Sequence, residues 1–327
     1  MFSVKQSEWY DVYLSQPDPS HIYTERKFYT NLQGKVYIKN VKFYDIGDAG
    51  VIFLNSSDLQ SLISTCLFEN SSNLKDYNGG GGSIWINQGE SAIQKVCSIG
   101  SKSRSIGPFS YLHVSNSDSV NKFSETSLFY GNRGEKIGFS TIYFDSGKIS
   151  FDQNNLTNNY CSSNSVYWMY GKSSSAYVNF SLFDKNEAYN QIFGCSVYVE
   201  YKNIIFTNNK VITAESYSGM ITVGFVYESI IFNNCYFSGN NQGSNSLFGC
   251  YGGCSYTIIK SYILCNSTLY SKAKFKYENT TVNLNLSLDP EKLCSFEKII
   301  IVNPESIKIR YKSEYLCYFA EILKSTI

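Results

Sequence analysis

The chain has 327 residues, of which 28 are Lys or Arg and 27 are Asp or Glu, for a net charge of +1. No block of like charge stands out, so the sequence does not predict binding to nucleic acid or to an acidic membrane surface. No apolar run reaches the roughly 18 residues of a membrane-spanning helix, and we predict no transmembrane span.

Residues 1–38 contain no repeated motif and are predicted to form an N-terminal cap. Residues 1–7 lack the apolar core of a secretory signal, so no signal peptide is readable. Trp9 and Tyr13 suit a segment that covers the first unit of a repeat array. Such a cover is expected because an open sheet edge would template aggregation.

Residues 39–270 repeat the tetrapeptide Phe-x-x-Asn, and its three clearest copies lie 23 and 31 residues apart. A second series of short apolar runs keeps step with the first, at a mean spacing of about 28 residues. Self-similarity of this kind indicates a solenoid, a propeller or an array. The repeat residues, in which Asn70 and Asn266 follow other apolar residues, are Asn70, Phe129, Asn132, Phe151, Asn154, Phe183, Asn186, Phe206, Asn209, Phe237, Asn240 and Asn266.

The apolar runs of this region are typical of strands. They are three to six residues long, rich in Val, Ile, Tyr and Phe, and bounded by Ser, Asn and Gly. A propeller blade needs four strands and about 40–50 residues, which is longer than this period. We therefore predict an all-β parallel β-helix (a solenoid) with terminal caps and about eight to nine coils.

Stacking explains the two repeat residues. Parallel strands lie about 4.8 Å apart, so equivalent positions of successive coils form columns. Asn tolerates the left-handed conformation of a sharp corner, and its amide can bond along the column. The Phe three positions earlier would point inward. Asn154, Asn186, Asn209 and Asn240 are expected to form a single column.

Asp152 and Asp184 each follow a repeat Phe on neighbouring coils, so the repeat predicts that their carboxylates lie one coil apart. A glycosidase needs two carboxylates, about 5–5.5 Å apart for retention or 6.5–9.5 Å for inversion. The pair is the candidate catalytic site, with Lys185 or Arg133 as a basic neighbour. The alternative is an exposed corner position that is acidic twice without catalytic meaning.

The ten Cys residues do not predict a metal site. Only Cys250 and Cys254 are closely spaced, and no second Cys or His pair completes a tetrahedral zinc site. We expect no metal or cofactor, and we expect most thiols to fill interior columns. Disulfides between coils are the alternative if the protein is exported.

Residues 271–327 lose the motif and are predicted to form C-terminal strands and a cap. Residues 281–288 alternate between apolar and polar side chains, as a half-buried strand does. Residues 299–302 and 307–311 are expected to be strands, and residues 314–327 a short closing helix.

Phe-x-x-Asn, combined with the Gly-Gly-x-Ile pattern at residues 81–84, resembles the paired repeats of chlamydial polymorphic outer membrane proteins. The Asn-, Ser- and Tyr-rich texture is similar to that of β-helix surface proteins of trichomonad protists. The resemblance implies a right-handed β-helix of the pectin lyase-like kind, used outside the cell for adhesion or surface variation. A cell-surface or secreted location follows from the resemblance alone.

The leading hypothesis is therefore a non-catalytic, adhesion-type interaction protein. The resemblance implies a host-cell or matrix protein or a glycan as its ligand, and we expect a monomer. The alternative is a carbohydrate-active enzyme, either a polysaccharide lyase or a glycoside hydrolase, with a pectate-lyase-like fold. That alternative needs Asp152 and Asp184 to converge.

Overall fold

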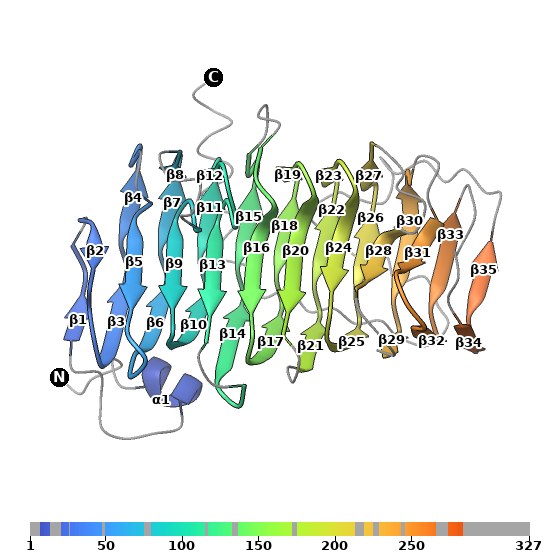
Figure 1. The fold of residues 1–327 in the computed structure, drawn as a ribbon, viewed down its shortest axis with the longest axis horizontal. Coiled ribbons are helices and arrows are strands. Elements are labelled where there is room, and N and C mark those ends of the chain that lie inside the picture. Colours follow the sequence, from blue (N-terminus) through green and yellow to red (C-terminus); the bar gives the residue numbers. More distant parts are fainter. Residues whose placement is uncertain are drawn as a thin grey trace.

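A computed structural model shows a nearly all-β chain in which the strands stack into one elongated solenoid (Figure 1). The predicted parallel β-helix is confirmed, with about eight turns. The structure describes residues 7–13, 21–25, 27–47, 50–74, 80–114, 117–132, 137–171, 175–212, 219–224, 229–242, 246–265 and 274–283.

Three long sheets run the length of the solenoid, and two short sheets fill one corner. The eleven-stranded sheet contains β1 (His21–Tyr23), β3 (Lys35–Lys39), β6 (Gln60–Ser64), β10 (Glu90–Gln94), β14 (Val120–Ser124), β17 (Lys148–Asp152), β21 (Ser175–Asn179), β25 (Tyr198–Lys202), β29 (Ser229–Asn233), β32 (Ser255–Ile259) and β34 (Lys274–Glu278). The ten-stranded sheet contains β4 (Lys42–Tyr44), β7 (Leu67–Glu69), β11 (Cys97–Ile99), β15 (Ser127–Phe129), β18 (Asn155–Thr157), β22 (Leu182–Asp184), β26 (Ile205–Thr207), β30 (Tyr236–Asn240), β33 (Tyr262–Cys265) and β35 (Thr281–Asn283). The nine-stranded sheet contains β2 (Tyr29–Thr30), β5 (Ile52–Asn55), β9 (Ile84–Asn87), β13 (Ser110–His113), β16 (Ser140–Asp145), β20 (Asn164–Tyr170), β24 (Gln191–Cys195), β28 (Gly219–Val223) and β31 (Ser246–Cys250). The short sheets contain β19 (Tyr160–Cys161), β23 (Glu187–Ala188) and β27 (Lys210–Val211), and β8 (Ser72–Asn73) and β12 (Lys102–Ser103).

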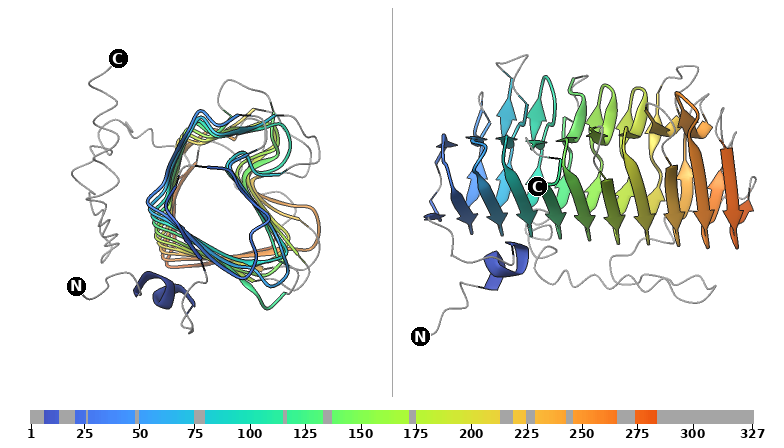
Figure 2. Two further views of the ribbon diagram at one scale, coloured as in Figure 1. Left: turned by 90° about the vertical axis from the view of Figure 1, so that its left-hand side faces the viewer. Right: turned by 60° about the horizontal axis from the view of Figure 1, so that its bottom comes forward.

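Each coil visits the three long sheets in the same order. In one coil, for example, β9 of the nine-stranded sheet is followed by β10 of the eleven-stranded sheet and β11 of the ten-stranded sheet. The strands of each sheet pair in parallel with the next coil, and seen end on the coils lie over one another (Figure 2). Stacked coils bury the inward side chains as continuous columns, which is why short apolar runs at a fixed period suffice for this fold.

Each coil turns twice with the same local geometry, once on either side of the ten-stranded sheet. The second turn of one coil shows the pattern: Phe183 points inward and is fully buried, and Asp184 faces outward. Lys185 then adopts the left-handed conformation with φ of 53°, and Asn186 is buried. The expectation that the repeat Asn itself takes the left-handed conformation is therefore wrong by one residue at this turn. The preceding residue takes it, and the Asn side chain is left to bond inside the stack.

Helix α1 (Ser7–Tyr13) packs against the outer face of the eleven-stranded sheet. Trp9 is 1% exposed and lies against Tyr37, Leu62 and Ala92 of three successive strands. The hydroxyl of Tyr37 also bonds to the Glu8 carboxylate. We expected this segment to cover the first coil, but the structure places it across the side of several coils.

Within the part of the chain that the structure describes, no helix has both the length and the apolar character that crossing a bilayer requires. The strands expected at residues 299–302 and 307–311, and the helix expected at 314–327, lie outside the described residues.

Candidate functional site

The carboxylates of Asp152 and Asp184 lie on different sheets. Asp152 ends β17 and pairs with strands of the eleven-stranded sheet, whereas Asp184 ends β22 in the ten-stranded sheet. Their motifs pass through different turns of the coil, so the expectation of one shared column is wrong. Asp184 is 9% exposed and accepts hydrogen bonds from Thr207 Oγ1 and Asn208 Nδ2, both at 2.9 Å. The Asp184 carboxylate therefore stabilises the turn of the next coil. The structure does not bring the two carboxylates together as a catalytic pair.

Two basic residues are predicted as neighbours of that pair. Lys185 is an exposed turn residue. Arg133 lies outside the described residues.

A column of four buried Asn side chains runs through the second turn. The Nδ2 atoms of Asn159, Asn186 and Asn209 each donate to Oδ1 of the next Asn, at 3.1 Å, and the column ends at Asn240. The same Oδ1 atoms accept main-chain N–H groups of the preceding coil at 3.0 Å. Each amide thus ties adjacent coils together. Asn159, which no Phe precedes at the repeat spacing, belongs to this column.

Asn154 does not belong to the column, contrary to expectation. It lies in the first turn, where it accepts from the Thr126 N–H and donates to the Phe123 carbonyl, both at 3.0 Å. Phe151 accordingly projects inward from the eleven-stranded sheet. Its ring centre lies 6.1 Å from that of Phe183, which projects inward from the ten-stranded sheet. Phe183, Phe206 and Phe237 do form one column, with ring centres 6.5 and 5.9 Å apart.

Three further repeat residues depart from their expected roles. Phe129 is partly exposed, because its neighbour Leu128 fills the inward position. Asn132 lies one residue after the column position of its coil. Its Oδ1 accepts from the Ser103 N–H at 2.9 Å, and its Nδ2 donates to the Ser103 carbonyl at 3.1 Å. Asn70 is exposed, has φ of 52° and donates to Asp45. Asn266 lies outside the described residues.

The outer face of the nine-stranded sheet carries a row of aromatic side chains that sequence reasoning did not single out. Phe53, Trp85, Tyr111, Tyr143 and Trp168 are partners in register on five successive strands. All five are partly exposed. Adjacent ring centres lie 3.9, 6.3 and 5.5 Å apart from Phe53 to Tyr143. These five side chains form a strip along the solenoid, which we call the aromatic row, and its rings are in contact from Phe53 to Tyr143.

The same sheet is nearly free of charge. Its nine described strands contain no Lys or Arg, and Asp145 is their single carboxylate. Asp145 Oδ2 accepts from the Tyr111 hydroxyl at 3.1 Å and lies 3.2 Å from Nδ1 of His113. Burial, and then the nearby Asp145 charge, raise the pKa of Tyr111, so its hydroxyl stays protonated. The eleven-stranded sheet, by contrast, carries Lys on several strands.

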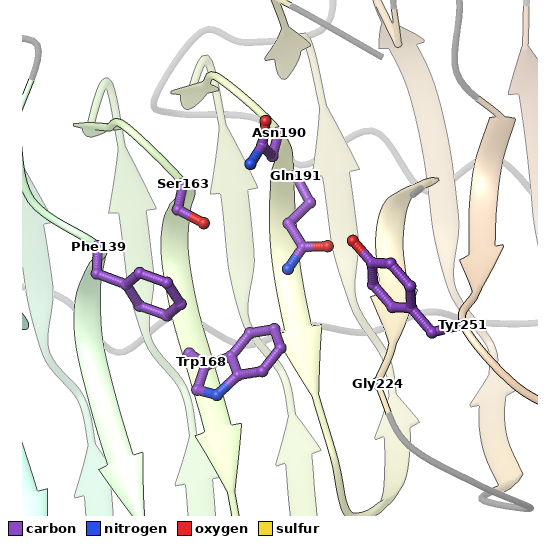
Figure 3. Close-up of a pocket in the computed structure, with 7 residues that line it drawn as sticks. All are labelled: Phe139, Ser163, Trp168, Asn190, Gln191, Gly224 and Tyr251. Atoms are coloured by element: carbon purple, nitrogen blue, oxygen red, sulfur yellow. The ribbon is translucent and has the colours of Figure 1, made fainter. Parts of the chain in front are cut away.

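A cavity of about 220 Å³ opens where the aromatic row ends (Figure 3). The row stops because the position after Trp168 in register is Gly194, where a Cβ would lie 1.9 Å from Cε3 of the indole. The cavity is lined by seven uncharged residues, namely Phe139, Ser163, Trp168, Asn190, Gln191, Gly224 and Tyr251.

The strands are irregular beside this cavity. The pairing of β20 with β24 shifts register between Asn164 and Tyr167. Such bulges change the direction of a side chain and are common next to functional sites. The Cys250–Cys254 disulfide closes a short loop that contains Tyr251, which is 45% exposed at the cavity wall.

The fold and this face define a parallel β-helix protein with an uncharged, aromatic outer strip. No family model and no curated protein sequence matches the chain, so the resemblance to polymorphic outer membrane proteins has no support beyond its short motifs. Among solved structures, the chain is similar to pectin methylesterase from carrot, with 7% sequence identity and a TM-score of 0.33. That similarity covers 82% of this chain and 84% of the carrot protein.

Proposed function

We propose that this protein is a non-catalytic binding protein that holds a neutral polysaccharide chain along the aromatic row. The observation that carries the proposal is the register of Phe53, Trp85, Tyr111, Tyr143 and Trp168 on a sheet whose described strands contain no Lys or Arg. Aromatic rings offer large apolar surfaces to the carbon-bound faces of sugar rings, while hydroxyl groups at the sugar edges remain in water. A strip that repeats with each coil suits a ligand that is itself a linear repeat.

The charge of the face selects among the possible ligands. Phosphate and carboxylate groups bind through Arg and Lys, and the described strands of this sheet have neither. Aromatic rows also bind single-stranded nucleic acid, but together with a positively charged groove. A neutral polysaccharide is a linear ligand that needs aromatic surface and no cation.

A binding role also agrees with the placement of carboxylates. Glycosidases that use two carboxylates place them across the scissile bond, and Asp145 stands alone on the described strands of this sheet. Asp152 and Asp184, the pair on which the enzymatic alternative depended, belong to different sheets. The geometry therefore favours binding over cleavage.

The expected location is at a cell surface or in a matrix, where neutral polysaccharides occur. A disulfide such as Cys250–Cys254 is typical of oxidising compartments outside the cytosol. An adhesion-type role is the biological form of this proposal.

The test is co-sedimentation of the full chain with insoluble cellulose, β-1,3-glucan and mannan, with polygalacturonate as the acidic comparison. We expect retention on at least one neutral polymer. The double variant Trp85→Ala/Tyr111→Ala should bind at least tenfold more weakly, because burying one aromatic side chain contributes about 1.5–3 kcal/mol. Tyr177→Ala is the matched control, since Tyr177 is 38% exposed on the eleven-stranded sheet. The proposal fails if no neutral polymer is bound, or if the double variant binds as well as the control.

A further inference from the structure

Two amide oxygens at the cavity lack hydrogen-bond partners. Gln191 is only 4% exposed and its Oε1 is buried, yet this oxygen accepts no hydrogen bond from the described part of the chain. Oδ1 of the adjacent Asn190 is in the same situation. A buried polar atom without a partner costs about 1–3 kcal/mol, and eleven side-chain atoms of the described residues are in this situation. These two are amide oxygens of neighbouring residues that line one cavity, where a ligand can supply the donors.

The cavity walls define the shape of that ligand. Figure 3 shows the Gln191 amide between the Trp168 indole and the Tyr251 phenol, with Ser163 and Asn190 above. The cavity volume of about 220 Å³ is larger than the roughly 150 Å³ of an engineered protein cavity that binds benzene, so it suits a single ring. Two aromatic walls and an amide floor fit a ring with apolar faces and polar edges.

The chemistry of the lining excludes a charged ligand. None of the seven lining residues is acidic or basic. An anion would face carbonyl oxygens without a compensating cation, and an ammonium group would lose its hydration without a counter-charge. Hydroxyl groups are neutral donors that can satisfy both amide oxygens after a small rotation of each amide.

We infer that Gln191 and Asn190 accept hydrogen bonds from two hydroxyls of one neutral sugar residue whose ring packs between Trp168 and Tyr251. This pocket determines which neutral polysaccharide the aromatic row holds, because a site built to accept hydroxyl donors discriminates against ligands that lack them. The inference rests on the proposed function. It adds a residue-level specificity site to a surface that otherwise recognises only shape and apolar area.

The test is isothermal titration of the full chain with linear hexaoses of β-1,4-glucan, β-1,3-glucan and β-1,4-mannan, each compared with its fully O-methylated form. Methylation removes the hydroxyl donors and keeps the ring. The wild type should bind at least one free hexaose about tenfold more tightly than its methylated form. Gln191→Leu, which keeps the approximate volume and removes the acceptor, should lose about tenfold in affinity for the free hexaose and most of this discrimination. Asn190→Ala should act in the same direction. Gln60→Leu, on the eleven-stranded sheet, is the control that leaves binding unchanged.

Thermal unfolding distinguishes a binding residue from a structural one. Gln191→Leu should unfold at the wild-type temperature or above it, since the oxygen that it removes has no partner in the fold. A clear fall in the unfolding temperature would show that the fold needs the amide, and it would overturn the inference. Wild-type discrimination by Gln191→Leu would also overturn it.

These failures differ from a failure of the proposed function. If the wild type binds polysaccharide through Trp85 and Tyr111 but does not distinguish methylated from free hexaoses, the inference alone is overturned. If the wild type binds neither the polymers nor the hexaoses, both are overturned.

Discussion

Replacing Asn209 by Ala should strongly destabilise the solenoid. The Asn209 side chain is fully buried and takes part in four hydrogen bonds. Its Nδ2 donates to the Phe183 carbonyl at 2.9 Å and to Asn240 Oδ1 at 3.1 Å. Its Oδ1 accepts from N and Nδ2 of Asn186, at 3.0 and 3.1 Å. The substitution would therefore cut the column in its middle and leave two buried donors of Asn186 without that acceptor.

The magnitude follows from those two donors. Each buried donor without a partner costs about 1–3 kcal/mol, so we expect Asn209→Ala to lower the free energy of unfolding by about 4 kcal/mol. The control is Asn208→Gly at the preceding position. Asn208 has φ of 54° and makes one bond to Asp184, and Gly adopts that conformation without strain. The control should therefore lose about 1 kcal/mol or less.

The assay is urea-induced unfolding of both variants, followed by far-ultraviolet circular dichroism and by tryptophan fluorescence. The midpoint for Asn209→Ala should shift far below that of the wild type, with the control close to the wild type. Equal losses for the two variants, or a loss below about 1 kcal/mol for Asn209→Ala, would refute the account of the column as a stabilising element.

Three further predictions concern the thiols, the disulfide loop and the helix. Burial raises the pKa of three of the buried free thiols, those of Cys66, Cys161 and Cys235, from 9.0 to about 12. These thiols should not react with Ellman's reagent at pH 8 in the native protein. The free energy of unfolding should fall as the pH rises from about 9 towards 12, because only the thiols of the unfolded chain ionise in that range. Urea titrations at pH 8 and pH 10 measure this, and an equal free energy of unfolding at the two pH values would contradict it. Reducing the Cys250–Cys254 disulfide frees the loop that holds Tyr251. Binding of the neutral hexaose should then weaken several-fold, while the circular dichroism spectrum stays unchanged. Equal affinity before and after reduction would show that the loop does not shape the cavity. Trp9→Ala removes the side chain that holds α1 to the sheet and weakens that contact by about 3–5 kcal/mol. Limited proteolysis should therefore cleave near the helix first and leave the coils intact. Cleavage spread evenly over the chain would contradict the conclusion that Trp9 holds only the helix.

The fold was predictable because its signal repeats. Strand-forming runs at a period of about 28 residues left room for one coil of a parallel solenoid and excluded propeller blades. The position of individual motifs was less predictable. Phe151–Asn154 and Phe183–Asn186 have the same pattern of an inward, an outward, a left-handed and a buried residue, yet they form different turns. Because both turns demand the same local geometry, a tetrapeptide cannot tell which turn it makes.

The Phe-x-x-Asn motif is missing between Asn70 and Phe129 for a similar reason. In those coils Ser71 and Ser101 take the buried position of the second turn that Asn186 takes later. Both are 2% exposed or less. A short hydroxyl side chain can fill the column, so the Asn pattern disappears from the sequence while the coil continues.

The aromatic row had a sequence signal, whereas the cavity had none. The five aromatic residues are spaced 32, 26, 32 and 25 residues apart. Each adjoins a residue of the second apolar series, whose members here are Ile52, Ile84, Leu112, Ile142 and Tyr167. That spacing could have shown that they share an outward column. The cavity depends on a register shift in β20 and on a Gly at position 194, and neither can be read without the paired strands.

Hydroxyl-radical footprinting of the full chain, with and without a saturating neutral polysaccharide, tests the binding face most directly. We predict that oxidation of Trp85, Tyr111, Tyr143 and Trp168 falls together on binding. Tyr177, on the eleven-stranded sheet, should be oxidised equally in both samples. Protection of Tyr177 without protection of the aromatic row would place the ligand on another face and contradict the account.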